Sequence, residues 1–221
     1  MAKLICKPKA VLFDLDGTLA DTFPLIVAAW NAAVSPHTGL AYTAAEVVSR
    51  FGIPDVAMIR RELPGVASEQ AVQAFLSYYE AQHDAIRLFE GISDLLGLLN
   101  RSATRLAIVT GKGGRCTAIT VRKLNWEPLF DAVVHGEDTP YQKPHPEPLL
   151  LACRRLGVEP STCIFVGDSP ADVRAARAAG MPSIAATWDS PFADQAIRAE
   201  PDFIATTPGE VGRLLMDAES L

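Results

Sequence analysis

The chain has 221 residues, of which 49% are hydrophobic and 21% charged, and it carries a formal net charge of −6. This length suits one α/β domain or a core with a small insertion, and the composition predicts a packed core instead of disorder. The negative charge argues against nucleic acid or an anionic membrane as the main partner, because both attract basic surfaces. A small anionic substrate needs only a local positive site and stays possible.

The cysteines and the apolar segments indicate where in the cell the protein is located. Four cysteines occur at positions 6, 116, 153 and 163 without a C-x-x-C pair, which fits a reducing cytosol better than a disulfide framework. The first residues lack the apolar stretch of a signal peptide, and no long apolar window is suited to span a membrane. We therefore expect a cytoplasmic protein.

The first predicted elements are one strand and a block of helices. The apolar run 10–13 predicts a buried strand that ends at Asp14. From Asp21 to about Leu88 no strand pattern occurs, and helices are predicted near 23–34, 43–50, 54–62 and 68–84. We therefore expect residues 21–87 to form a small helical cap domain, inserted into a core made of residues 1–20 and 88–221.

Strands and helices alternate in the second part of the chain. Apolar runs at 106–109, 132–134 and 163–166 predict further strands, separated by amphipathic stretches near 92–101, 115–125, 147–156 and 170–179. The sequence from Thr207 to Glu210 has capping-box spacing and predicts a last helix to about Met216. Alternation of this kind predicts an α/β fold with a Rossmann-like open parallel sheet.

Polar residues follow the predicted strands where the ligands of an open α/β sheet bind. They are Asp14, Asp16, Thr110, Asp168 and, just beyond another strand, Lys143. Carboxylates gathered at one place repel one another, so a divalent cation is their natural partner, and oxygen ligands suit Mg²⁺.

The spacing of the first two acids suggests covalent chemistry. A carboxylate such as Asp14 can attack phosphorus and form an aspartyl-phosphate. A second carboxyl two positions along a strand points to the same face, so Asp16 can protonate the leaving oxygen and then activate water.

The ordered motifs of this chain resemble those of the haloacid dehalogenase-like (HAD) hydrolase superfamily. The four segments start at Asp14, Thr110, Lys143 and Gly167, and they read DLDGT, TGK, KPHP and GDSPAD. The insertion between the first two motifs is similar to the helical-cap subfamily, and the closest resemblance is to phosphoglycolate phosphatase-like enzymes. The resemblance implies a magnesium-dependent phosphatase that hydrolyses a small phosphomonoester.

The resemblance also implies a role for each matching residue. Asp14 would be the nucleophile and a metal ligand, and Asp16 the general acid/base that also gives the metal its backbone carbonyl. Thr110 and the N–H of Gly111 would hold the phosphoryl group, Lys143 would neutralise its charge, and Asp168 would bind the metal. The supporting residues of these motifs are Gly17, Thr18, Ser169 and Asp172.

Gly111 departs from the pattern, because many members of the superfamily have asparagine after the threonine of the second motif. The backbone N–H is retained, whereas an amide side chain that would contact the substrate or the loop behind Asp14 is missing.

Three alternatives remain open on the sequence alone. One is a phosphosugar mutase resembling β-phosphoglucomutase, another is an inorganic pyrophosphatase, and the third is a non-catalytic relative that keeps the HAD fold and binds a partner. The four histidines show no metal-ligand spacing and are interpreted as surface or turn residues: His37, His83, His135 and His145.

Overall fold

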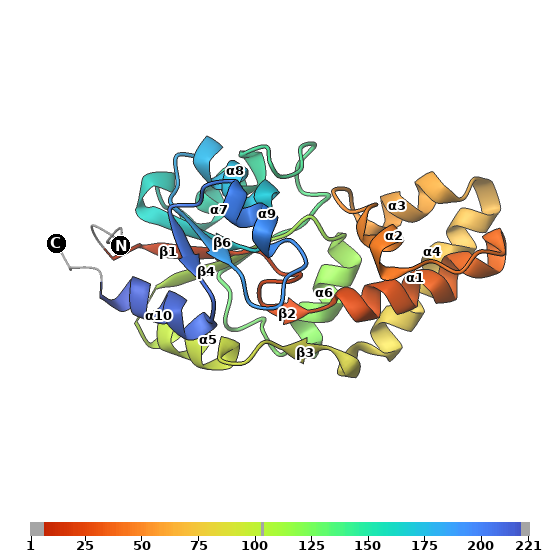
Figure 1. Cartoon of the computed structure of the whole chain (residues 1–221), viewed down its shortest axis with the longest axis horizontal. Coiled ribbons are helices and arrows are strands. Elements are labelled where there is room, and N and C mark those ends of the chain that lie inside the picture. Colours follow the sequence, from red (N-terminus) through yellow and green to blue (C-terminus); the bar gives the residue numbers. More distant parts are fainter. Residues whose placement is uncertain (1–6, 103, 218–221) are drawn as a thin grey trace.

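In a computed structural model, residues 7–102 and 104–217 are described, and they form a parallel sheet between layers of helices (Figure 1). The sheet has six strands in the order β5-β4-β1-β6-β7-β8. The strands are β1 (Ala10–Phe13), β4 (Arg105–Val109), β5 (Ala132–Val134), β6 (Cys163–Gly167), β7 (Ser183–Ala186) and β8 (Phe203–Ala205). This architecture confirms the predicted α/β fold with an open parallel sheet.

Strand β1 lies in the middle of the sheet and is buried on both faces. It pairs in parallel with β4 on one side and β6 on the other. Its residues alternate between two apolar clusters, with Val11 and Phe13 in one and Ala10 and Leu12 in the other. This two-sided burial explains why the strand reads as a continuous apolar run.

Strands β7 and β8 were not predicted from the sequence. Strand β7 has the sequence SIAA, and alanine and serine have little preference for strands. Strand β8 has only three residues, of which Ile204 is 48% exposed at the edge of the sheet. Both strands depend on pairing with a neighbouring strand, which a local pattern does not report.

The helices predicted for the α/β part agree with the structure to within about two residues, the usual scatter of helix ends, whereas α9 (Ala193–Arg198) was not predicted. Helix α8 begins with a complete capping box in which Ser169 and Asp172 bond to each other. The other helices of this part are α5 (Ile92–Arg101), α6 (Gly114–Lys123), α7 (Glu147–Leu156), α9 (Ala193–Arg198) and α10 (Pro208–Met216), and α8 spans Pro170–Ala178.

Helices also fill residues 22–86, at one end of the molecule (Figure 1). They are α1 (Phe23–Thr38), α2 (Ala44–Val48), α3 (Asp55–Glu62) and α4 (Gly65–Ala81). A capping box of Thr43 and Glu46 begins α2. These helices share an apolar cluster around Trp30 and Phe75, which also takes in Cys116 and Ile119 of α6. This segment is joined to the sheet by an antiparallel pair, β2 (Ala20–Asp21) and β3 (Arg87–Leu88).

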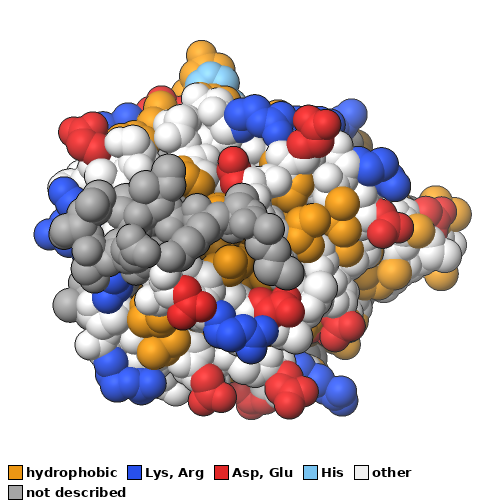
Figure 2. Space-filling model, turned by 60° about the vertical axis from the view of Figure 1, so that its left-hand side comes forward, with side chains coloured by type: hydrophobic (Ala, Val, Ile, Leu, Met, Phe, Trp, Pro, Cys, Tyr) orange, Lys and Arg blue, Asp and Glu red, His pale blue; other side chains and the backbone are white. Residues whose placement is uncertain are grey.

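Positive and negative side chains are mixed on the face of the molecule seen in Figure 2. On the side seen in Figure 2, Lys and Arg side chains alternate with Asp and Glu side chains. No helix in the described ranges has the length and apolar character needed to cross a bilayer.

Candidate active site

The predicted site residues gather at the carboxyl ends of β1, β4 and β6. A cavity of about 300 Å³ opens there, between the sheet and helices α1 to α3. The predicted residues that line it are Asp14, Asp16, Thr110, Gly111, Lys143, Asp168 and Ser169. The tertiary structure therefore brings together the ends of all four motifs, from positions more than a hundred residues apart in the chain.

Asp14 continues the hydrogen bonding of β1 and faces Lys143. Its backbone N–H donates to Val166 at 2.9 Å, which fixes its position at the end of the strand. Lys143 Nζ donates to Asp14 Oδ1 at 2.8 Å and forms an ion pair with Asp172 Oδ1 at 2.6 Å. One buried ammonium group thus bridges two carboxylates.

Three buried acids meet beside this lysine. Ligand oxygens of Asp14, Asp168 and Asp172 all lie within 4.8 Å of one another. Burial, only partly offset by Lys143, raises the pKa of Asp14 to about 7, and burial together with the neighbouring acids raises the pKa of Asp168 well above its ordinary value. A cluster of oxygen ligands that is costly to ionise without a counter-charge fits a divalent cation.

The loop after β1 and the loop after β7 hold Asp168 of this cluster in place by hydrogen bonds. Ser190 Oγ donates to Asp168 Oδ2 at 2.5 Å, and Thr18 Oγ1 donates to Asp168 Oδ1 at 3.4 Å. The turn after Asp16 passes so close to Asp168 that a Cβ at Gly17 would lie 2.4 Å from Asp168 Oδ2, and its φ is +84°. Glycine is therefore required at position 17.

Thr110 and Gly111 line the cavity directly after the end of β4. The backbone N–H of Lys112 donates to Thr110 Oγ1 at 3.1 Å, and no described residue accepts the hydroxyl proton of Thr110. This proton is available for an anion in the cavity. A Cβ at Gly111 would approach only Gln142 Oε1, at 3.9 Å, so the space of the missing asparagine side chain is open.

Asp16 is held through one of its two oxygens. Thr22 Oγ1 donates to Asp16 Oδ1 at 2.5 Å, and Lys112 Nζ donates to the same oxygen at 3.0 Å. No described residue bonds to Asp16 Oδ2. One oxygen is thus anchored while the other is free to exchange a proton.

The helical segment supplies the apolar wall of the cavity. Its lining side chains are Phe23, Ile26, Val48, Phe51, Ile53 and Met58. The only charged residue that it adds is Asp55, at the beginning of α3, whose pKa is raised by burial. The residues at the strand ends therefore form a charged floor of the cavity, and the helical segment forms its largely apolar roof.

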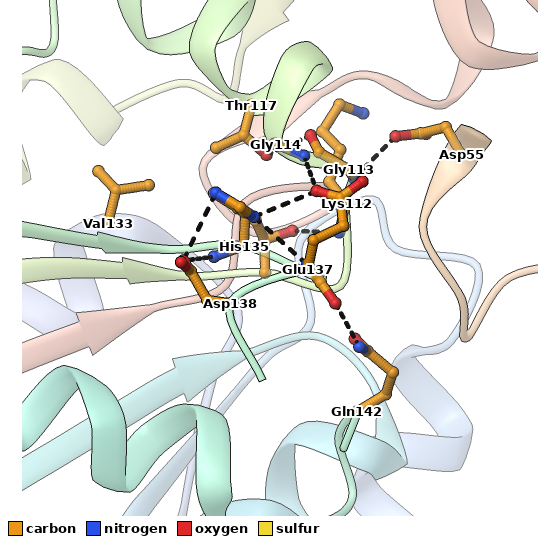
Figure 3. A network of polar contacts seen from close by, with 12 residues as sticks. Asp55, Lys112, Gly113, Gly114, Thr117, Val133, His135, Glu137, Asp138 and Gln142 are labelled. Atoms are coloured by element: carbon orange, nitrogen blue, oxygen red, sulfur yellow. Dashed lines mark hydrogen bonds and ion pairs between the residues drawn. The ribbon is translucent and has the colours of Figure 1, made fainter. Parts of the chain in front are cut away.

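Asp55 connects the helical segment to the loop after β4. Figure 3 shows its side chain reaching the beginning of α6, where Asp55 Oδ2 accepts from the N–H of Gly113 at 2.8 Å. On the other side of this helix end, Glu137 Oε2 accepts from the N–H of Gly114 at 2.5 Å. Negative side chains thus satisfy two free N–H groups of α6 and interact favourably with its dipole.

The sequence did not reveal several of these residues. Lys112 was visible in the TGK motif but had no assigned role, and Asp55 and Ser190 occur in segments without a recognisable motif. The interpretation of His83 as a surface or turn residue was wrong with respect to burial. It is 2% exposed, because its ring is covered by α4 and α6 and its Nε2 lies 3.1 Å from Thr120 Oγ1.

Known proteins are similar to this chain in both sequence and fold. Residues 11–186 match the family model of the haloacid dehalogenase-like hydrolases. A phosphoglycolate phosphatase from Xanthomonas campestris pv. campestris is 39% identical over 185 residues, which cover 82% of this chain and 84% of the relative.

Solved structures agree with this assignment. A predicted phosphoglycolate phosphatase from Haemophilus somnus 129PT superposes with a TM-score of 0.82 at 26% identity, covering 93% of this chain and 97% of that structure. CbbY from Rhodobacter sphaeroides, solved in complex with phosphate, gives a TM-score of 0.78 at 26% identity and covers 93% and 96%. The chain therefore belongs to the haloacid dehalogenase-like hydrolases and is a phosphatase of that family.

Proposed function

We propose that this phosphatase hydrolyses a small phosphomonoester through an aspartyl-phosphate on Asp14, with phosphoglycolate as the first substrate to test. The observation that carries the proposal is the buried contact of Asp14 with Lys143, at 2.8 Å, inside a cavity that also contains Asp16 and Thr110. The names of the curated relatives support the choice of phosphoglycolate.

In the first step, a carboxylate oxygen of Asp14 attacks phosphorus and the bond to the leaving oxygen breaks. Asp16 gives its proton to that oxygen, so the leaving group departs as an alcohol. Lys143 and the hydroxyl proton of Thr110 balance the charge of the phosphoryl oxygens. The short contacts of Lys143 with two acids hold its ammonium group in place for this purpose.

In the second step, Asp16 is a base. It takes a proton from water while the water oxygen attacks phosphorus of the aspartyl-phosphate, which releases inorganic phosphate and restores Asp14. The free Oδ2 of Asp16 supports this double role, because its other oxygen is already bonded to Thr22 and Lys112.

We propose Mg²⁺ as the metal, held by Asp14, Asp168 and the backbone carbonyl of Asp16. When bound, the ion would offset the negative charge that accumulates on the phosphoryl oxygens. The fit rests on the buried oxygen donors and on the raised pKa values of Asp14 and Asp168. Asp172 stands beside them, paired with Lys143.

We also propose that residues 21–87 form a cap domain that opens and closes over the site. Its apolar roof would exclude bulk water, which strengthens the electrostatic interactions on the floor. The apolar cluster that its helices form around Trp30 and Phe75, which only α6 of the α/β part joins, and its attachment by the short β2–β3 pair support this assignment.

The first experiment measures phosphate release from a panel of phosphoesters with Mg²⁺ and with EDTA. The panel contains phosphoglycolate, sugar phosphates and inorganic pyrophosphate. We expect Mg²⁺-dependent release that is highest for one phosphomonoester. Isomerised sugar phosphate without net release would favour the mutase, release from pyrophosphate alone the pyrophosphatase, and bound Mg²⁺ without turnover the non-catalytic protein.

The variant Asp14→Asn tests the nucleophile. It should abolish turnover, because an amide is not an effective nucleophile toward phosphorus. The matched control is Asp94→Asn, which makes the same change at an exposed position of α5 and should leave turnover as in the wild type. An Asp14→Asn enzyme with wild-type turnover would refute the proposed mechanism.

A further inference from the structure

Lys112 carries a buried charge to which the reaction steps above assign no task. Its side chain is 0% exposed, whereas the whole residue is 4% exposed, so the solvent-exposed atoms of Lys112 belong to its backbone. The ammonium group therefore lies behind the cavity wall. A substrate in the cavity would meet Asp16 before it met this group.

The ammonium group of Lys112 forms an ion pair with the carboxylate of Asp16. Lys112 Nζ lies 3.0 Å from Asp16 Oδ1 and 4.8 Å from the centre of the Tyr79 ring. Asp16 is its only ion-pair partner among residues 7–102 and 104–217. Because an unpaired buried charge is costly, this geometry ties the position of Asp16 to that of Lys112.

Two donors reach the same oxygen of Asp16 from different directions. Thr22 comes from the start of α1, and Lys112 comes from the loop between β4 and α6. The carboxyl group is therefore fixed by Oδ1, and Oδ2 has no partner among the described residues. An oriented, unoccupied oxygen at the cavity wall is what proton transfer to a leaving group needs.

We propose that Lys112 is a positioning residue for the proton transfer by Asp16, a role that rests on the function proposed above. It holds Asp16 Oδ1 so that Oδ2 faces the leaving oxygen of the substrate. Lys112 itself contacts neither the phosphoryl group nor the leaving group, and it acts only through Asp16.

This role predicts that the leaving group decides how much Lys112 matters. An alkoxide is a poor leaving group and needs a proton from Asp16, whereas p-nitrophenolate departs without one. The constant kcat/KM reports the steps up to formation of the aspartyl-phosphate, and the later attack of water does not affect it. Comparison of kcat/KM between substrates therefore isolates the first proton transfer.

The test replaces Lys112 by methionine and measures kcat/KM with three substrates in the presence of Mg²⁺. Phosphoglycolate and ethyl phosphate both release an alcohol, and only the first carries a carboxylate. The third substrate is p-nitrophenyl phosphate. We expect Lys112→Met to lower kcat/KM about 10²-fold for both alkyl substrates, the size of a typical general-acid contribution. For p-nitrophenyl phosphate, the loss should stay below about threefold.

Lys123→Met is the matched control, because it removes a lysine from α6 that lies 3.6 Å from Asp84, away from the cavity. It should leave the three constants as in the wild type. Equal losses of kcat/KM for all three substrates in Lys112→Met, or no loss at all, would overturn the proposal. A loss confined to phosphoglycolate would also overturn it, because Lys112 would then bind the carboxylate of the substrate.

A second variant covers the case in which Lys112→Met does not fold. Thr22→Val removes the other donor to Asp16 Oδ1 and should give the same dependence on the leaving group. Uniform losses in a folded Thr22→Val enzyme would then count against the proposal. Failure of the proposed function is distinguishable, since in that case the wild-type enzyme itself would release no phosphate from any of the three substrates.

Discussion

Asp14→Asn should stabilise the metal-free protein, although it removes the proposed nucleophile. Burial raises the pKa of Asp14 from 3.8 to about 7, so the folded state favours the protonated form. A raised pKa of an acid contributes stability that is present below pH 3.8 and is lost as the pH rises through 7. Asparagine cannot ionise and avoids this loss.

The size of the effect follows from the pKa shift. One pKa unit corresponds to about 1.4 kcal/mol, so ionisation of Asp14 costs the folded state about 4 kcal/mol at pH 8 and about 2 kcal/mol at pH 5. Lys143 lowers the pKa of Asp14 against the larger effect of burial, so the value of about 7 already contains the contact between the two residues. In the variant, Asp172 remains as the ion-pair partner of Lys143.

Thermal unfolding in EDTA at pH 5 and pH 8 measures this difference. The melting temperature of Asp14→Asn relative to wild type should increase from pH 5 to pH 8, by an amount equivalent to about 2–3 kcal/mol or roughly 5–10 °C. If the difference between the two proteins is the same at both pH values, Asp14 does not have a raised pKa in the folded protein. The reasoning about the acidic cluster would then be wrong.

Three further changes probe the floor of the cavity. Asp168→Asn should remove most of the rise in melting temperature that Mg²⁺ gives the wild-type protein, measured by a titration with the ion. Gly17→Ala should lower the free energy of unfolding by about 2–4 kcal/mol in denaturant titrations, because its Cβ would collide with Asp168 and the residue has a φ of +84°. Gly111→Asn should fold with a free energy of unfolding within about 1 kcal/mol of wild type, because the space beside it is open. A large loss in this variant would contradict the open geometry.

The sequence was most informative for features that depend on residues close together in the chain. Apolar runs such as 10–13 and 163–166 are buried on both faces of the sheet, so their composition alone indicated central strands. The start of the last helix was also accessible, because its capping residue Thr207 acts within one turn of the chain. The edge strand β8 was not accessible, since its short segment becomes a strand only by pairing with β7.

The sequence also determined which chemical groups the site contains. Asp14, Asp168 and Lys143 could be proposed from their motifs, because a parallel sheet brings the ends of its strands to one edge. Their meeting within a few ångströms and the resulting pKa shifts were decided by the tertiary structure, because burial and distance are not local properties.

What only the tertiary structure decided is how the helical segment and the loops support those groups. The contact of Asp55 with Gly113 and the contact of Lys112 with Asp16 join segments 58 and 96 residues apart. Neither contact has a sequence signature, since an aspartate at the start of a helix and a lysine in a loop are common surface features. Their burial depends on how the helical segment and the loop after β4 come together at the cavity, and long-range packing of this kind is fixed only when the whole chain has folded.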